Sequence, residues 1–265
     1  TGFYISYDGG KQWSSLQLNL PVTPITDLKV HKGDLLASTM GRSFWILDDL
    51  NPLRQFNRNS TKDEMIVYTS EESYRVSGYS AMDDASAIDD EGPSTSTSGT
   101  NAPTGVVIYF QLPVTADSSA SLSIDIIDEK GRMVRHYSDK EDKDFVGYPG
   151  GPSPDPVLVK RIGLNRFVWN MRYPTLPGVP TVFIEGAYEG RKAAPGNYVA
   201  SIKYGKSEKQ VAIKILPDPR IKATTEDYSA QQALSAKVED DVREIHSMVL
   251  SVRKVRKQLL DISEL

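Results

Sequence analysis

Short apolar segments separated by turn residues occupy the first quarter of the chain. Each segment spans four to six residues, and Gly, Asn, Asp or Pro stand between them. Strands of this length, with turn residues about every 8–12 positions, are typical of a sheet protein. The predicted strands cover residues 3–6, 13–18, 25–30, 35–39 and 43–47.

Residues 105–217 show a related pattern, in which apolar and polar positions alternate in several segments. Val106–Phe110 is a continuous apolar run that suits a buried strand. Residues 122–126 and 133–137 flank a turn at Asp128–Gly131 and predict a hairpin. Further strands are predicted at 164–171, 197–204 and 210–216. About seven short alternating strands indicate an immunoglobulin-like or fibronectin-III-like β-sandwich.

The last segment, residues 218–265, has the spacing of one long amphipathic helix with Thr224 or Thr225 as its N-cap. Apolar residues recur at steps of three and four and form one helix seam: Leu234, Val238, Val242, Ile245, Val249, Val252, Val255, Leu259 and Ile262. A helix of about 40 residues spans roughly 60 Å. A small sandwich cannot cover such a length, so we expect the seam to dock a second helix or a partner chain.

Residues 76–104 differ in composition from the segments on either side. Ser, Thr, Gly and Pro dominate, and the segment contains acidic residues but no Lys or Arg. This composition predicts a solvated linker. The alternative is a calcium loop, because Asp83, Asp84, Asp89, Asp90 and Glu91 carry oxygen ligands. Their spacing does not fit the EF-hand pattern, which favours the linker.

Together these patterns predict a mainly β protein in four parts. We expect a propeller-blade region at 1–75, a linker at 76–104, a β-sandwich at 105–217 and a long helix at 218–265.

The sharpest local motif is Ser6-Tyr7-Asp8-Gly9-Gly10-Lys11-Gln12-Trp13, which fits the Asp-box pattern S-x-D-x-G-x-x-W. The Ser6 and Asp8 side chains can accept hydrogen bonds from turn amides, and Gly10 permits a positive φ. We expect Trp13 to pack beneath the hairpin. A ligand or calcium loop is the functional alternative, but the hydrogen bonds expected within the turn favour a structural role.

Composition narrows the classes of function. The 265 residues carry a net charge of −4 and no cysteine. The slightly negative charge argues against nucleic-acid binding. The absence of cysteine excludes disulfides and a Cys nucleophile. No apolar run is long enough to span a membrane.

Candidate catalytic groups are scattered. His31, His136 and His246 lie in separate segments with no obvious carboxylate companion, so we expect neither a metal site nor a resident cofactor. Neither a G-x-S-x-G motif nor a phosphate-binding glycine loop occurs. Arg42 and Asp8 alone cannot build the many-residue site of a sialidase-type glycosidase.

Several motifs resemble one bacterial family, the BNR/Asp-box repeat β-propellers that are often labelled sortilin (VPS10)-like or glycosyl hydrolase. The resemblance rests on the Asp-box, on residues 18–28, and on Met40–Asp49 with its blade motif Gly41, Arg42 and Trp45. It continues through Gly163–Trp169, Ala194–Tyr198, Leu216–Arg220 and the final helix. The weakest part is 76–103.

The resemblance implies the C-terminal, noncatalytic part of an exported protein, located in the periplasm, at the outer membrane or outside the cell. Its expected partners are the rest of the propeller or another chain, which would meet the blade edge and the helix seam. The alternative is an accessory part of a sialidase-like glycoside hydrolase that binds carbohydrate. Both ends resemble interrupted elements, so we expect a longer natural chain.

Overall fold

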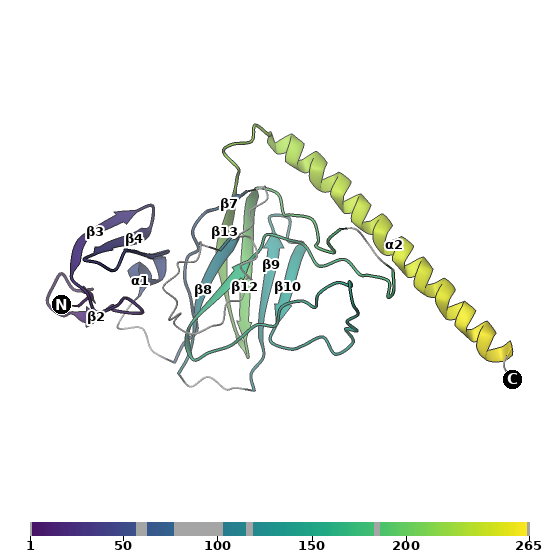
Figure 1. Ribbon diagram of the computed structural model, residues 1–265, viewed down its shortest axis with the longest axis horizontal. Coiled ribbons are helices and arrows are strands. Elements are labelled where there is room, and N and C mark those ends of the chain that lie inside the picture. The colour runs from purple at the N-terminus through teal and green to yellow at the C-terminus, as the bar shows by residue number, and fades with distance from the viewer. Residues whose placement is uncertain (1, 57–62, 77–102, 115–118, 183–185, 264–265) are drawn as a thin grey trace. The chain divides into compact units, whose positions relative to one another are not determined.

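The computed structural model describes residues 2–56, 63–76, 103–114, 119–182 and 186–263. It is mainly β, with several sheets, one of them curled into a half-barrel, and a long C-terminal helix (Figure 1). The chain divides into two compact units. Unit 1 contains residues 1–60 and 80–104, and unit 2 contains residues 61–79 and 105–265.

Unit 1 contains a two-stranded pair, a three-stranded sheet and a short helix. The pair joins β1 (Tyr4–Ile5) to β2 (Ser14–Ser15), and the sheet has the antiparallel order β3-β4-β5. The sheet strands are β3 (Ile25–His31), β4 (Asp34–Thr39) and β5 (Phe44–Leu47). All five strands overlap segments that the apolar pattern predicts. Helix α1 (Asn51–Gln55) follows, with a Pro in its first turn where no backbone donor is needed.

Unit 2 contains two sheets. One has the order β10-β9-β12-β13-β7 and the other the order β11-β8-β6. The strands are β6 (Ile66–Val67), β7 (Ser73–Arg75), β8 (Val106–Leu112), β9 (Leu122–Asp128), β10 (Met133–Ser138), β11 (Gly163–Trp169), β12 (Gly196–Tyr204) and β13 (Ser207–Pro217). Pairing is antiparallel except between β13 and β7, which run parallel.

One apolar core lies between these sheets. Val106, Ile108, Phe110 and Leu112 alternate with half-buried residues along β8. The run 106–110 is therefore an alternating strand with one inward face, and not one that is buried on both faces. The core also takes residues from β9, β12 and β13, and Trp169 on β11 is fully buried within it.

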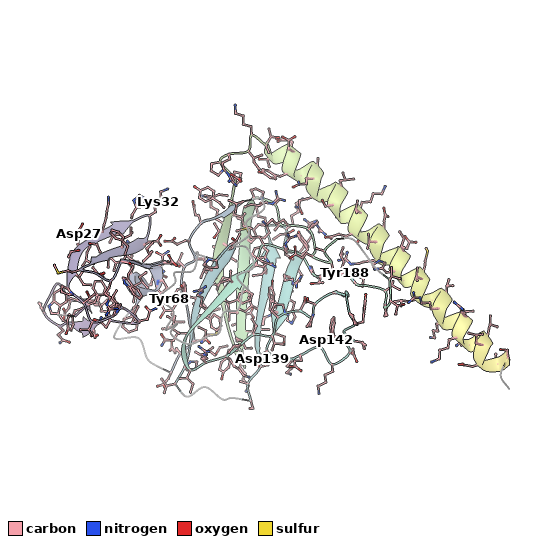
Figure 2. The ribbon with its side chains drawn as sticks, viewed as in Figure 1. Asp27, Lys32, Tyr68, Asp139, Asp142 and Tyr188 are labelled. Carbon is pink, nitrogen blue, oxygen red and sulfur yellow. The ribbon has the colours of Figure 1, made fainter. Side chains whose placement is uncertain are left out.

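Strands β6 and β7 were not predicted and belong to unit 2. Their pairing with β8 and β13 is defined over only a few residues. Tyr68, labelled in Figure 2, follows β6 and is buried. Its Oη donates a hydrogen bond to Oε1 of Gln111 at 3.1 Å. Strands this short carry too few alternating positions to be recognised from a pattern.

The last element is α2 (Thr225–Ser263), whose 39 residues match the predicted helix. Thr224 and Asp227 form a reciprocal cap. Asp227 N donates to Thr224 Oγ1 at 3.1 Å, and Thr224 N donates to Asp227 Oδ2 at 2.8 Å. This arrangement satisfies two backbone donors at the helix start.

Candidate interaction surfaces

The Asp-box forms the turn between β1 and β2. Ser6 Oγ accepts a hydrogen bond from Gly10 N at 2.8 Å, and Asp8 Oδ1 accepts one from Gln12 N at 2.8 Å. Ser6 Oγ also donates to Asp8 Oδ1 at 2.9 Å, and Gly10 has a φ of 90°. Both polar side chains are therefore directed at their own turn, which is what a structural motif requires.

Trp13 does not pack beneath the hairpin, because 62% of its surface is exposed. Its indole Nε1 donates to the Gly10 carbonyl at 3.0 Å. The expected packing was wrong, because the β1-β2 pair has only two residues in each strand and offers too little surface to cover an indole.

The blade motif Gly41, Arg42 and Trp45 contains the same kind of indole-to-backbone hydrogen bond. Gly41 has a φ of 79°, and Trp45 Nε1 donates to the Arg42 carbonyl at 2.8 Å. In both motifs the indole donates to the residue three positions earlier. The main chain of Arg42 is thus part of the turn between β4 and β5, and its side chain is not needed for that contact.

An apolar groove of about 330 Å³ lies within unit 1. It is lined from β1, β3, β4 and α1, and the lining includes Tyr4, Leu28, Val30, Leu35 and Leu53. Arg54 is the one charged residue of the lining, which contains no carboxylate. A glycosidase needs two carboxyl groups beside the scissile bond, so the groove cannot perform that chemistry by itself.

The other face of the β3-β4-β5 sheet is mixed: β3 contributes polar residues to it, such as Lys29 opposite Leu36, whereas β5 contributes apolar ones. Leu36 on β4 pairs with Ile46 on β5, so their side chains share one face, and Phe44 joins them two positions along β5. Phe44 is 81% exposed and Ile46 is exposed as well. The sheet therefore exposes apolar side chains on the β5 side of this face.

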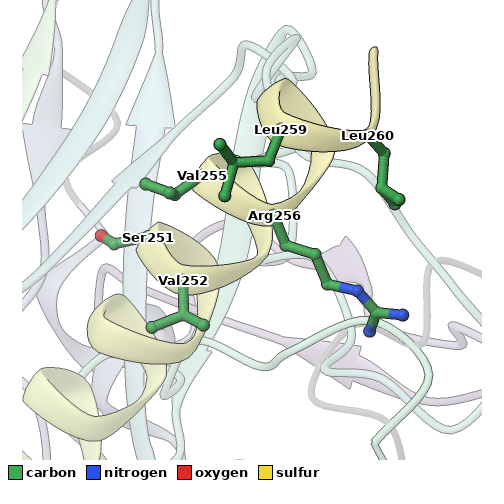
Figure 3. A pocket seen from close by; sticks show the side chains of 6 residues that line it. All are labelled: Ser251, Val252, Val255, Arg256, Leu259 and Leu260. Carbon is green, nitrogen blue, oxygen red and sulfur yellow. The ribbon is translucent and has the colours of Figure 1, made fainter. Parts of the chain in front are cut away.

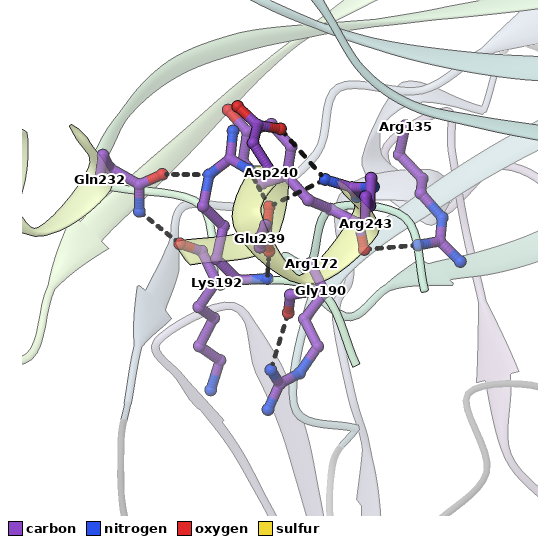
Figure 4. A network of polar contacts seen from close by, with 10 residues as sticks. Arg135, Arg172, Gly190, Lys192, Gln232, Glu239, Asp240 and Arg243 are labelled. Carbon is purple, nitrogen blue, oxygen red and sulfur yellow. Dashed lines mark hydrogen bonds and ion pairs between the residues drawn. The ribbon is translucent and has the colours of Figure 1, made fainter. Parts of the chain in front are cut away.

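The long helix is attached to its own unit through a polar face (Figure 4). Glu239, the one buried residue among the described residues of α2, pairs with the guanidinium of Arg191 and accepts from its backbone N–H. Gln232 Nε2 donates to the Lys192 carbonyl and Arg191 Nε donates to Gln232 Oε1. The Arg191 guanidinium also lies 3.6 Å above the ring of Tyr173.

Three further contacts extend this attachment along the helix. Arg75 Nη2 on β7 donates to Gln231 Oε1 at 2.9 Å. His246 Nδ1 contacts the Pro177 carbonyl, and Arg253 Nη1 donates to the Pro180 carbonyl. The attachment thus reaches from the first turns of α2 to Arg253.

The predicted helix seam lies mostly outside this attachment. Val242 and Val249 are half-buried, while the other seven seam residues are exposed. Val252 alone is 68% exposed, and Figure 3 shows Val252, Val255 and Leu259 on the last turns of the helix. We did not expect α2 to be attached through a polar face while its apolar seam stays exposed. Sequence spacing does not show which face of a helix meets the sheets.

A polar cluster lies across the five-stranded sheet. Asp125 on β9 stands opposite His136 on β10 and Ser201 on β12. Asp125 Oδ1 lies 2.6 Å from His136 Nδ1, and Lys203 Nζ donates to Asp125 Oδ2 at 3.0 Å. Burial raises the pKa of Asp125, but the bonds from His136 and Lys203 outweigh it and hold this pKa below its ordinary value.

This cluster corrects the expectation that no histidine has a carboxylate companion. It does not form a catalytic triad, because Asp125 stands between the histidine and Ser201, whereas a triad places the histidine in the middle. Ser201 Oγ instead donates to Glu208 Oε1 at 2.6 Å. The arrangement is a cross-strand ladder. A β-bulge between Met133 and Arg135 shifts the register by one residue and brings His136 opposite Asp125, so the turn at 128–131 alone does not predict the pair.

The structure tests the remaining candidate sites only in part. The acidic residues of the calcium alternative, Asp83 to Glu91, lie outside the described residues. Within the described part of the chain, no group of three or more His, Cys, Asp or Glu residues could hold a metal ion. In that same part, no helix is long and apolar enough to cross a membrane.

Comparison with known proteins does not add a relative. No family model matches the chain, and neither a curated protein nor a solved structure matches it. The candidate surfaces therefore rest on the geometry alone.

Proposed function

We propose that this chain is a noncatalytic structural and interaction segment of an exported bacterial Asp-box propeller protein. In this proposal unit 1 supplies closing strands of the propeller, and α2 docks a partner chain. The observation that carries the proposal is the β3-β4-β5 sheet, which has one apolar face and exposes Phe44 and Ile46 on the β5 side of the other.

A propeller blade is a small sheet that packs against a neighbour on each side. Such a sheet needs apolar residues on both faces, whereas a solvated antiparallel sheet alternates apolar and polar faces. In unit 1, Leu28 and Val30 line the groove on one face, while Phe44 and Ile46 stand exposed on the other. These exposed apolar residues support a blade whose Phe44 face packs against a neighbouring blade.

The Asp-box hairpin supports the same proposal. The β1-β2 turn is rigidified by Ser6, Asp8 and Trp13, and this hairpin borders the groove that also contacts β3 and β4. A hairpin of one blade beside the sheet of the next would place the groove between two adjacent blades.

For unit 2 we propose a fibronectin-III-like or immunoglobulin-like sandwich. A five-stranded and a three-stranded sheet that share one core support this assignment. The parallel pairing of β13 with β7 is a departure from a purely antiparallel sandwich. Export and an extracytoplasmic location rest on the family resemblance of the motifs.

The experiment extends the chain with the polypeptide encoded immediately upstream and compares amide hydrogen exchange in the two proteins. We expect the amides of β3 and β5 to exchange at least about tenfold more slowly in the longer protein. Phe44→Asp should remove that protection, because it places a carboxylate on the blade face. Val22→Asp is the matched control, since Val22 is also exposed but lies outside the strands. Unchanged exchange in β3 and β5 would refute the blade proposal.

A further inference from the structure

The exposed apolar residues of α2 follow a stricter repeat than the predicted seam. Two members of the predicted seam, Val242 and Val249, are half-buried. If Asp241 and Met248 take their places, the spacing between successive residues of the set alternates strictly between four and three. We call this set the heptad face: Leu234, Val238, Asp241, Ile245, Met248, Val252, Val255, Leu259 and Ile262. Its eight apolar members are all exposed. A strict 4-3 alternation over four heptads is the pattern of a coiled coil.

The heptad face and the attached face occupy different sides of the helix. At about 100° per residue, Glu239 lies roughly 140° around the axis from Leu234. Attachment through Glu239 and Gln232 therefore leaves the heptad face open along the whole helix. Residues 250–263 are all exposed, and within the described part of unit 2 the hydrogen bond from Arg253 to the Pro180 carbonyl is the one polar contact of this C-terminal third with another element.

Charge is distributed unequally along α2. Residues 225–246 contain six acidic and two basic side chains, a net charge of −4. Residues 247–263 contain four basic and one acidic side chain, a net charge of +3. Two such helices attract each other when they run in opposite directions and repel when they run in the same direction.

Asp241 supports the same orientation. In an in-register parallel pair it would face Asp241 of the second helix within the apolar layer, and burying two like charges together is costly. In an antiparallel pair that matches Leu234 with Leu259 and Val238 with Val255, Asp241 faces Val252. A single polar residue at a core position sets register and orientation at a cost in stability.

From these observations we infer that α2 binds a second copy of this chain as an antiparallel helix pair through the heptad face. The exposed C-terminal third of each helix would then lie against the attached half of the other. This inference rests on the partner-docking part of the proposed function and names the partner.

The first test measures the mass of the chain in solution by light scattering after size exclusion, at micromolar concentrations. We expect twice the 29.4 kDa of one chain. Val252→Glu should weaken association by about 100-fold or more, and Asp241→Leu should strengthen it. Leu250→Glu is the matched control, because Leu250 is exposed but lies roughly 160° around the helix from Val252. Circular dichroism checks that each variant keeps its helix.

The second test determines orientation and uses the absence of cysteine in the chain. A mixture of Leu234→Cys and Leu259→Cys chains should form a disulfide-linked heterodimer, while each variant alone should stay uncrosslinked. A disulfide between two Leu234→Cys chains would show a parallel pair and overturn the inference.

A monomeric parent chain, or a dimer that Val252→Glu leaves intact, would also overturn the inference. Slower exchange in β3 and β5 of the longer protein would leave the blade proposal standing in either case, so the two failures are distinguishable.

Discussion

Glu239 on α2 pairs with Arg191, which lies 48 positions earlier on the connection between β11 and β12. Glu239 is 5% exposed, and its carboxylate accepts from both the side chain and the backbone N–H of Arg191. This contact anchors a helix that has no other buried residue in its described part.

Glu239→Ala should detach the middle of α2 from unit 2. Removing Glu239 leaves Nη1 and the backbone N–H of Arg191 without their acceptor, while Nε keeps Gln232, and the loss costs on the order of 2–4 kcal/mol. Faster amide exchange in residues 232–246 would report the detachment. Asp240→Ala is the control, because Asp240 is an exposed neighbour on the same helix. An Arg191→Ala, Glu239→Ala double-mutant cycle should show that the two effects are not additive.

Asp8→Ala should loosen the Asp-box turn. Asp8 accepts hydrogen bonds from Gln12 N and Ser6 Oγ, so its loss costs about 1 kcal/mol of local stability. Amide exchange at Gln12 should accelerate by about fivefold, whereas exchange in unit 2 should stay unchanged. Lys11→Ala, in the same turn, serves as the control; an equal effect there would mean that the side chain of Asp8 is unimportant.

Acidification should weaken unit 2 through Asp125. Its pKa in the folded protein lies below the ordinary value, so its contribution is complete above about pH 4. The contribution is lost as the pH falls through the folded pKa, because protonation removes the charge that His136 and Lys203 face. Urea unfolding between pH 6 and pH 2 should show a shallower decline for Asp125→Asn than for the parent chain. Parallel curves would contradict this prediction.

Thr224→Ala should fray the start of α2. The Thr224 hydroxyl accepts from Asp227 N, and the loss of such a cap costs about 1 kcal/mol. The bonds that Asp227 accepts from Thr224 also hold the pKa of Asp227 below its ordinary value. An NMR titration should therefore find a higher Asp227 pKa in Thr224→Ala, and no change in Thr225→Ala.

Much of the fold could be predicted from local patterns. The strands from Ile25 to Leu47, the hairpin around Gly131 and the helix from Thr225 onward follow from period-two or helical spacing and from turn residues. Contacts between distant segments could not be predicted in this way. The parallel pairing of Ser73–Arg75 with β13 and the burial of Glu239 depend on where the chain returns in space.

The candidate surfaces show the same division. The Asp-box residues bond within their own turn, as their spacing predicts. The seam was predicted in outline, but Val242 and Val249 are half-buried while Met248 is exposed. Steps of three and four fit either choice, and only the polar contacts of Glu239 and Gln232 decide which side of the helix is covered.

The full burial of Trp169 gives the molecule an internal reporter. Trp169 lies in the core of unit 2, and its Nε1 donates to the Arg172 carbonyl at 3.2 Å, while the other two indoles, Trp13 and Trp45, belong to unit 1. An indole sealed from water shifts its emission to longer wavelength when it becomes hydrated, whereas an already exposed indole such as Trp13 barely shifts. Trp45 is half-buried and adds a smaller shift from unit 1, so intrinsic fluorescence during heating follows chiefly the melting of the larger unit. An additional calorimetric transition would belong to the smaller unit.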